Sequence, residues 1–256
     1  MNYQNELALA KKIARKAGDV MLEYFDADQD LDHKDDGTVV TIADKTINRM
    51  VIEEIGKNLN DGVIGEEEST AEYGPGRKWI CDPIDGTKAF VVGVPTSTFS
   101  LALAIDGLPV LGVVYDPYLD RLYWGIKGQG SYCNDKELKV SNNPIKGHYV
   151  GVSSGNTGLV DKGNVIKQLL NSGAKLDTTH GAVYKSCLVA HGRTVGYIEP
   201  RVNPHDVAAI HLIVEEAGGK VTGYRGEKLD YTKHFYGVIV SNGKVHDELL
   251  RCIEAG

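Results

Sequence analysis

One short segment, residues 79–90, constrains this chain more than any other feature of its sequence. It reads WICDPIDGTKAF and places two aspartates, Asp82 and Asp85, three positions apart around a proline. Its first three residues are typical of a strand, and its proline and glycine are typical of a turn. In one interpretation the strand simply ends in a tight turn. In the other, Asp82 and Asp85 are a pair of hard oxygen ligands, and Gly86-Thr87 opens a helix towards an anion.

Local backbone chemistry makes the second interpretation specific. A following proline restricts Asp82 to an extended backbone, so its carboxylate leaves the strand in a defined direction. Gly86 tolerates dihedral angles forbidden to other residues, which lets the chain turn so that Asp85 faces the same ion. In such a turn we expect Asp85 to have no helix-related or packing role. Backbone N–H groups near Gly86 and Thr87 would form a phosphate seat if a helix begins there.

Further carboxylates stand at the ends of apolar runs or at helix starts: Asp44, Glu66, Glu67 and Asp206. Asp44 and Asp206 could be simple helix N-caps, each contributing about 1 kcal/mol, and the glutamates at 66–68 could form a solvated loop. Gathered at one place, however, these groups would repel one another unless a cation neutralised them. The joint pattern therefore indicates an oxygen-ligated divalent metal beside a phosphate-binding turn. These two features together favour an enzyme that acts on phosphoryl groups.

Charge and hydropathy exclude several other classes. The 256 residues carry a net charge of −7 with no basic run, so we expect no nucleic-acid partner. No apolar stretch is long enough to span a bilayer, and the charged, amphipathic N-terminus is unlike a signal peptide. The four scattered cysteines predict reduced, buried thiols rather than disulfides or a zinc site. We therefore expect a cytoplasmic protein without a membrane partner.

The first part of the chain predicts two helices followed by antiparallel strands. Apolar residues recur at helical spacing in the N-terminal segment, which favours a helix with one buried face. We predict helices at 4–26 and 41–59, a polar loop or exposed hairpin at 26–37, and a strand meander at 97–105, 109–116 and 121–126. A further hairpin is expected around Asn134-Asp135.

From about residue 145 the pattern changes to an alternation of helices and strands. We predict strands at 148–154, 194–200 and 237–243, and helices at 164–173, 184–192, 206–219 and the C-terminus. This favours an α/β or α+β layered architecture. We expect an N-terminal α+β half, 1–145, with most metal ligands, and a C-terminal α/β half, 146–256, with Asp206 and the substrate contacts.

Four motifs in the same order resemble those of the inositol monophosphatase superfamily: VVTIAD ending at Asp44, GEE at 65–67, DPIDGT at 82–87, and DVAA…EAGG at 206–219. The resemblance implies an alternating αβαβα sandwich of the inositol monophosphatase/fructose-bisphosphatase type. It also implies a lithium-sensitive, Mg²⁺-dependent phosphatase with two to three ions, which hydrolyses a phosphate monoester and is commonly a homodimer. Its partner would then be a small phosphate ester.

The resemblance also assigns roles by position. The first metal would have as ligands Glu66, Asp82, the Ile84 carbonyl and Thr87. The second would have Asp82, Asp85 and Asp206, and a third, weaker site would have Glu67 and Asp44. Phosphate would bind the backbone amides of Gly86 and Thr87. Catalysis, by a metal-activated water attacking in line, would use Glu66, Thr87 and Asp85.

The substrate is less constrained. Glu199 stands where inositol monophosphatases contact a substrate hydroxyl, whereas Arg201 could bind a second phosphate, as in the fructose-bisphosphatase-like branch. Lys185 is similar to a residue of 3′-phosphoadenosine 5′-phosphate phosphatases, and DGTKAF also resembles histidinol-phosphate phosphatases. His205 departs from the aromatic residue usual at its position. These differences leave several branches of the superfamily as alternatives.

The leading hypothesis is hydrolysis of inositol monophosphate or a similar small polyol or sugar phosphate. The alternatives within the fold are a histidinol-phosphate phosphatase, a 3′(2′),5′-bisphosphate nucleotidase and a fructose-1,6-bisphosphatase. A non-catalytic regulatory binding protein of the same fold is the alternative of another class. Because every expected ligand position carries a suitable residue, the enzyme is favoured.

Overall fold

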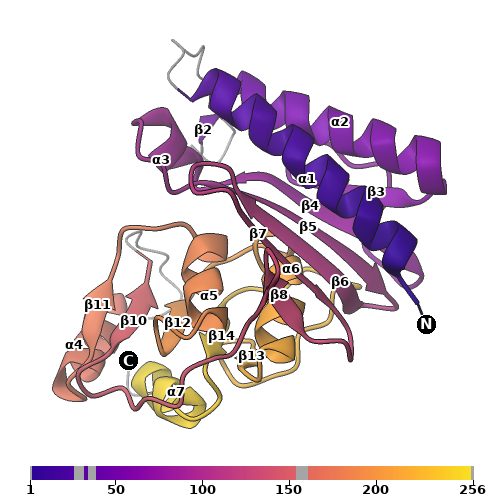
Figure 1. Ribbon diagram of the computed structural model, residues 1–256. Helices are drawn as coiled ribbons and strands as arrows, with labels where there is room; N and C mark the ends of the chain where they lie inside the picture. The colour runs from indigo at the N-terminus through magenta and orange to yellow at the C-terminus, as the bar shows by residue number, and fades with distance from the viewer. Residues whose placement is uncertain (1, 26–31, 34–38, 154–160, 255–256) are drawn as a thin grey trace.

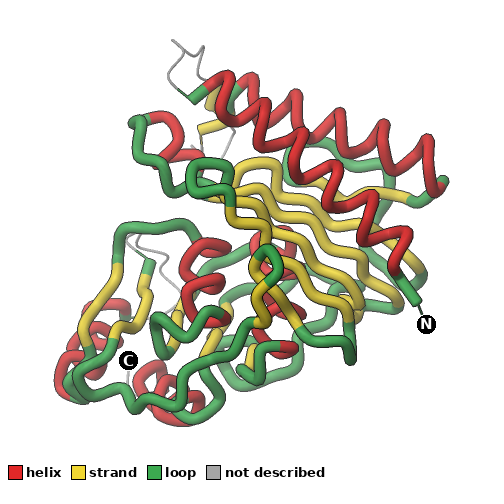
Figure 2. The backbone as a smooth tube through the Cα atoms, in the orientation of Figure 1, coloured by secondary structure: helices red, strands yellow, loops and turns green. Residues whose placement is uncertain are grey.

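Five alternating layers of helices and sheets make up the computed structural model, which describes residues 2–25, 32–33, 39–153 and 161–254 (Figures 1 and 2). Helices α1 (Gln4–Tyr24) and α2 (Ile42–Leu59) cover one face of a seven-stranded sheet. Helices α5 (Ala182–Ala190) and α6 (Pro204–Glu216) lie between this sheet and a five-stranded one. Helices α4 (Lys162–Asn171) and α7 (His246–Glu254) cover the far face. The predicted αβαβα sandwich is confirmed.

The outer helices form where the periodicity predicts. The buried face of α1 consists of Leu7, Ala10, Ile13, Ala14, Ala17, Gly18 and Met21. Helix α2 begins after Thr41, which accepts a hydrogen bond from the backbone of Asp44, and ends at Asn60 in the left-handed conformation. Of the segment 26–37, the structure describes β1 (Asp32–His33), which pairs antiparallel with β2 (Val39–Val40). The rest of that predicted loop or hairpin lies outside the described residues.

The seven-stranded sheet carries the meander. Its order is β3 (Gly62–Gly65), β4 (Arg77–Asp85), β5 (Thr98–Ile105), β6 (Leu108–Asp116), β7 (Arg121–Ile126), β8 (Ser131–Cys133) and β9 (Lys136–Glu137). Strands β3 and β4 are parallel, and all other neighbours are antiparallel. The hairpin between β8 and β9 turns at Asn134, whose φ is 52°, as predicted.

Strand β4 does not end at the first aspartate. It continues through Pro83 to Asp85 with a shift of register against β5 between the two aspartates. Gly86 then takes a φ of 84° and the short helix α3 (Thr87–Val91) begins. A bulge of this kind re-aims side chains at the end of a strand, so both aspartates reach the same side of the sheet.

The five-stranded sheet has the order β11 (Lys175–Asp177), β10 (Tyr149–Val152), β12 (Gly196–Glu199), β14 (Val238–Ser241) and β13 (Lys220–Thr222). Strands β10, β12 and β14 and the four helices α4–α7 were predicted. Strands β11 and β13 were not, because three residues show no periodicity. Strand β12 ends at Glu199, next to the loop that leads into α6.

Three apolar clusters separate the layers. The middle cluster contains residues from both sides of residue 145, among them Ile80 and Ala208, and the division into halves stays a prediction. The four cysteines are free and buried, as expected. Within the described residues, no helix combines the length and the apolar character needed to cross a membrane.

Candidate active site

Three of the predicted carboxylates meet between the large sheet and α6. Asp82 and Asp85, on β4, and Asp206, in the first turn of α6, each offer an oxygen within 4.8 Å of the others. The two strand residues are buried and Asp206 is partly buried. Three hard anionic oxygens so close together could hold a divalent cation.

Asp85 has a structural role that the sequence did not predict. Its carboxylate accepts hydrogen bonds from the N–H groups of Ala182 (3.0 Å), Val183 (3.0 Å) and Tyr184 (3.4 Å), at the start of α5. A Cβ on Gly181 would lie 2.2 Å from Asp85 Oδ2. The expectation that Asp85 has no helix-related or packing role is therefore wrong, because its carboxylate satisfies the free N–H groups of a helix from the other half of the chain.

Asp82 is the least satisfied of the three. Neither of its carboxylate oxygens has a hydrogen-bond partner within the described residues. Burial raises the pKa of Asp82 well above its usual value, and the charges of Glu66, Asp206 and Asp85 raise it further. Two buried, partnerless oxygens beside two more carboxylates fit a small cation with hard oxygen preference, because a cation would supply both the missing contacts and the missing charge.

The other two members are perturbed in the same direction. Burial raises the pKa of Asp85 to about 7; the charge of Asp206 adds to the shift, and the N–H groups of α5 oppose it. Burial and the charge of Glu66 raise the pKa of Asp206 to about 7, against the N–H of Asn203. Burial, together with repulsion among the carboxylates, thus favours protonation when no cation is bound.

Asp44 and Asp206 both reach back to the start of their helices. Each is the third residue of its helix and accepts a hydrogen bond from the N–H that precedes the first turn, from Thr41 at 2.8 Å and from Asn203 at 2.7 Å. One oxygen of Asp44, Oδ1, has no partner in the described chain. Burial raises the pKa of Asp44 to about 7; hydrogen bonds from Thr41 oppose this, and the charges of Glu66 and Glu67 add to it. The expectation that these aspartates are N-caps is wrong, because Thr41 and Asn203 are the N-caps and the aspartates complete the two capping boxes from the third helical position. The charges of Glu66 and Glu67 that act on Asp44 place it near the acidic site.

Glu66 approaches the cluster through His205. The Nε2 atom of this buried imidazole lies 3.9 Å from Glu66 Oε2 and 3.9 Å from Asp206 Oδ1. The backbone N–H of Glu66 donates to the Cys81 carbonyl. This hydrogen bond holds the residue after β3 beside the part of β4 that leads to Asp82. The N–H of Glu67 donates to Asn48 of α2 at 3.4 Å, which holds this segment beside Asp44's helix.

Thr87 and Ile84, expected to share a metal, are already in contact. The Thr87 hydroxyl donates to the Ile84 carbonyl over 3.0 Å. The positive φ of Gly86 between them is a conformation that residues with a side chain rarely adopt. The turn therefore presents a hydroxyl and a carbonyl oxygen side by side, directly after Asp85.

The expected substrate contacts differ in exposure. Glu199 is buried and accepts a hydrogen bond from the Tyr197 hydroxyl at 2.8 Å. Lys185 is buried in α5 and donates to the Val152 carbonyl at 2.9 Å; burial lowers its pKa, and the charges of Glu199, Asp177 and Asp85 act in the opposite direction. Arg201 is exposed. Glu199 and Lys185 therefore belong to the electrostatic surroundings of the acidic site.

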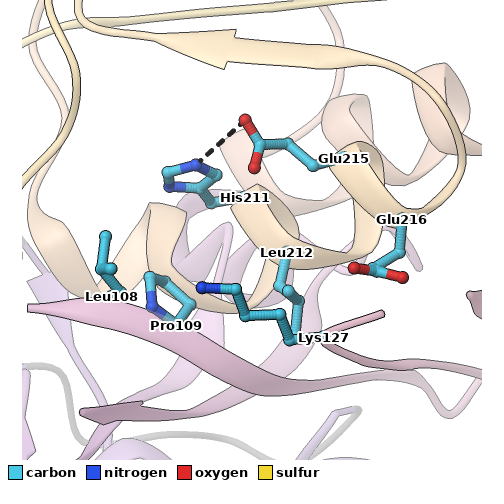
Figure 3. A pocket seen from close by; sticks show the side chains of 7 residues that line it. All are labelled: Leu108, Pro109, Lys127, His211, Leu212, Glu215 and Glu216. Carbon is cyan, nitrogen blue, oxygen red and sulfur yellow. Dashed lines mark ion pairs between the residues drawn. The ribbon is translucent and has the colours of Figure 1, made fainter. Parts of the chain in front are cut away.

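A separate pocket of about 100 Å³ lies beside the second half of α6 (Figure 3). His211 Nε2 there pairs with Glu215 Oε1 at 3.4 Å, and the other ring nitrogen bonds the Tyr231 hydroxyl at 3.1 Å. Asp206 stands at the opposite end of the helix. At roughly 1.5 Å per residue, this pocket is too far along α6 to belong to the acidic site.

Sequence reasoning did not find the groups that hold the carboxylates in place. Gly181, the amides of α5 and Tyr197 act on Asp85 or Glu199 through contacts that only the fold creates. The only local sign of these contacts in the sequence is Gly181, a glycine directly before the segment that forms α5. Of the residues predicted from the sequence, Asp82, Asp85 and Asp206 come together in the structure. The metal and catalytic roles of these three, of Glu66 and of Thr87 stay predictions.

Comparison with known proteins gives matches over the whole chain. A family model described as "Inositol monophosphatase family" matches residues 2–255. A protein of Thermotoga maritima named fructose-1,6-bisphosphatase/inositol-1-monophosphatase is 34% identical over 97% of this chain and 96% of its own. A histidinol-phosphatase of Mycobacterium tuberculosis is 34% identical over 98% of this chain and 99% of its own. A Nus factor SuhB of Pasteurella multocida is 36% identical over 86% of this chain and 85% of its own.

A solved structure agrees with the fold. That of a Thermotoga maritima IMPase superposes with a TM-score of 0.88 at 30% identity, over 98% of this chain and 97% of the other. The names of these relatives span several substrates and a Nus factor. They agree on the fold and leave the substrate open.

Proposed function

The chain belongs to the inositol monophosphatase family, and from this we propose that it is a Mg²⁺-dependent phosphomonoesterase acting on inositol monophosphate or a similar small polyol or sugar phosphate. The observation that carries the proposal is the meeting of Asp82, Asp85 and Asp206 within 4.8 Å. Family membership supports phosphate-ester hydrolysis, and the acidic cluster supports a metal-dependent form of it.

In this proposal each site residue has a separate role in binding or catalysis. Asp82, Asp85 and Asp206 would hold the cation between β4 and α6, with Glu66 and Thr87 orienting the attacking water. The amides of Gly86 and Thr87 would bind phosphate oxygens. Mg²⁺ bound there would screen the phosphate charge and make a bound water more acidic. A weaker cation position beside Asp44 and Glu67 is proposed on the same basis.

Glu199 supports a hydroxyl-bearing substrate. Its carboxylate is fixed by Tyr197 and can accept further hydrogen bonds from polyol hydroxyls, whereas it would repel a second phosphate. Arg201, which could have favoured a bisphosphate, is exposed. Histidinol phosphate, 3′-phosphoadenosine 5′-phosphate and fructose 1,6-bisphosphate are the rival substrates.

The test is phosphate release from these four substrates with Mg²⁺ and then with a chelator. We expect the fastest release from inositol monophosphate and none after chelation. Preference for a bisphosphate would contradict the substrate, and full activity in chelator would contradict the metal. A protein that releases phosphate from none of them but binds a macromolecular partner would be the non-catalytic regulator instead.

We further propose inhibition by lithium at the second metal position, a homodimeric assembly and a cytoplasmic location. The first two rest on the family resemblance, and the location rests on the four free, buried cysteines, which suit a reducing compartment. Size-exclusion chromatography with light scattering tests the assembly directly.

A further inference from the structure

The face of the large sheet that meets α5 and α6 contains polar side chains next to the acidic cluster. Side chains alternate between the two faces of a strand. On β5, Ala102 belongs to the apolar cluster between the sheets and Leu101 to the cluster under α1 and α2. Ser100 and Thr98 have the same parity as Ala102 and therefore point towards α5 and α6.

The next strand continues this row. On β6, Val114 belongs to the middle cluster, so Asp116 points to the same side. Phe99 pairs with Tyr115 across β5 and β6, and the same antiparallel register places Thr98 opposite Asp116. Asp116 is fully buried.

The row joins the acidic cluster on its other side. Ser100 is the register partner of Asp82, and Thr98 is the register partner of Asp85. Strand β5 thus places its two hydroxyls between the carboxylates of β4 and the carboxylate of Asp116. All five residues are at least nine-tenths buried.

The hydroxyls and one oxygen of Asp116 lack a protein partner. Thr98 Oγ1, Ser100 Oγ and Asp116 Oδ2 have no hydrogen bond to any group in the described parts of the chain. The other oxygen of Asp116 accepts the N–H groups of Tyr118 at 3.1 Å and Leu119 at 3.2 Å, which fixes the orientation of the carboxylate and leaves Oδ2 free to bind elsewhere.

Buried polar groups in folded proteins are nearly always hydrogen-bonded, to protein or to ordered water. Facing side chains on neighbouring strands have Cβ atoms about 4.5–5.5 Å apart. A tetrahedral water making two bonds of about 2.8 Å bridges oxygens at roughly this separation. An internal water also needs two to four polar partners, which this row supplies.

We propose that Thr98, Ser100 and Asp116 hold ordered internal water that links them to Asp82 and Asp85 and positions those two carboxylates for metal binding. The effect on metal binding rests on the proposed function, because it assumes that Asp82 and Asp85 bind the metal and that residues of β5 and β6 orient them. Two of the three groups are neutral hydroxyls that can both donate and accept, so water suits the row better than a further cation.

The first test compares Mg²⁺ affinity by isothermal titration calorimetry. Thr98→Val has nearly the same shape and removes the hydroxyl, while Thr98→Ser retains it. We expect Thr98→Val and Ser100→Ala to weaken Mg²⁺ binding about tenfold, the lower end of what loss of a ligand's supporting contact causes, and Thr98→Ser to bind as the wild type does. The matched control is Thr194→Val, which removes another buried hydroxyl that has no partner in the described chain, in the bend before β12.

The second test is a high-resolution crystal structure of the metal-free wild-type protein. We expect water density between Thr98 Oγ1 and Asp116 Oδ2. Absence of that density, or Mg²⁺ affinity within twofold of the wild type in both Thr98→Val and Ser100→Ala, overturns the proposal. If the wild-type protein binds no Mg²⁺ at all, the proposed function fails, and the density then decides the water row by itself.

Discussion

Replacing Asp85 by asparagine should have opposite effects on activity and on the stability of the metal-free protein. The amide keeps the shape and one acceptor for the N–H groups of α5 but removes an anionic ligand. With Mg²⁺ present, we expect Asp85→Asn to lower phosphate release at least 100-fold. Without metal, the same change removes a buried charge that the other carboxylates repel.

The stability effect follows from the raised pKa. Burial raises the pKa of Asp85 to about 7 in the folded protein, from an ordinary value of 3.8. Because its pKa is raised on folding, the folded protein holds the Asp85 proton more tightly than the unfolded chain does. The stabilisation from this proton is fully present below pH 3.8 and is lost as the pH rises through 7. At about 1.36 kcal/mol per unit, the ionised group destabilises the metal-free protein by about 4 kcal/mol at pH 8. Asp85→Asn should therefore match the wild type near pH 4 and exceed it at pH 8 by up to about 4 kcal/mol.

The assay is urea unfolding in chelator between pH 4 and 8, followed by phosphate release with Mg²⁺. Asp161→Asn is the control, because Asp161 caps α4 through the N–H of Asn164 and asparagine caps equally well. Normal turnover of Asp85→Asn with an unchanged circular dichroism spectrum would refute the metal assignment. A metal-free wild type whose stability does not fall between pH 4 and 8 would refute the charge argument.

Four further predictions concern the same site. Gly181→Ala should reduce activity at least tenfold, because its Cβ would displace the Asp85 carboxylate; Gly56→Ala, in open space on α2, should leave turnover unchanged. Glu199→Gln should slow inositol monophosphate turnover about tenfold, the scale of one lost charge-assisted bond, while sparing an aryl phosphate. Arg201→Ala should not change monophosphate hydrolysis, and loss of a preferred bisphosphatase activity in that variant would contradict the inositol assignment. Lithium should inhibit at millimolar concentrations, and a partly active Asp206 variant that remains equally sensitive would show that lithium binds elsewhere.

Much of the fold was predictable because periodicity is local. Helix α2 was predicted at 41–59 and found at Ile42–Leu59, and the strands of the meander lie within one residue of their predicted bounds. Strands β11 and β13, of three residues each, were missed because so short a segment has no periodicity and forms only against its neighbours.

The acidic residues could be picked out from the sequence, but the groups that hold their carboxylates in place could not. Carboxylates beside proline, glycine and helix starts are visible in sequence. The hydrogen bonds from α5 to Asp85 join residues almost a hundred positions apart, and no local pattern encodes such a contact. The polar row on β5 and β6 could have been suspected from Thr98 and Ser100 on an otherwise apolar strand, but its neighbour Asp116 follows only from the strand register.

The placement of the three carboxylates on β4 and α6 has a kinetic consequence if they hold a cation as proposed. Asp82 and Asp85 come from the first half of the chain and Asp206 from the second, so the three carboxylates meet only when α6 has docked against the large sheet. A cation that binds all three binds the native state better than any partly folded one, and we expect this stabilisation to appear late in folding. It should then act mainly on the unfolding rate, because interactions absent from the transition state slow unfolding without speeding folding. Depletion of the metal would shorten the lifetime of the native state, and proteases would cleave the chain sooner although its equilibrium structure is unchanged.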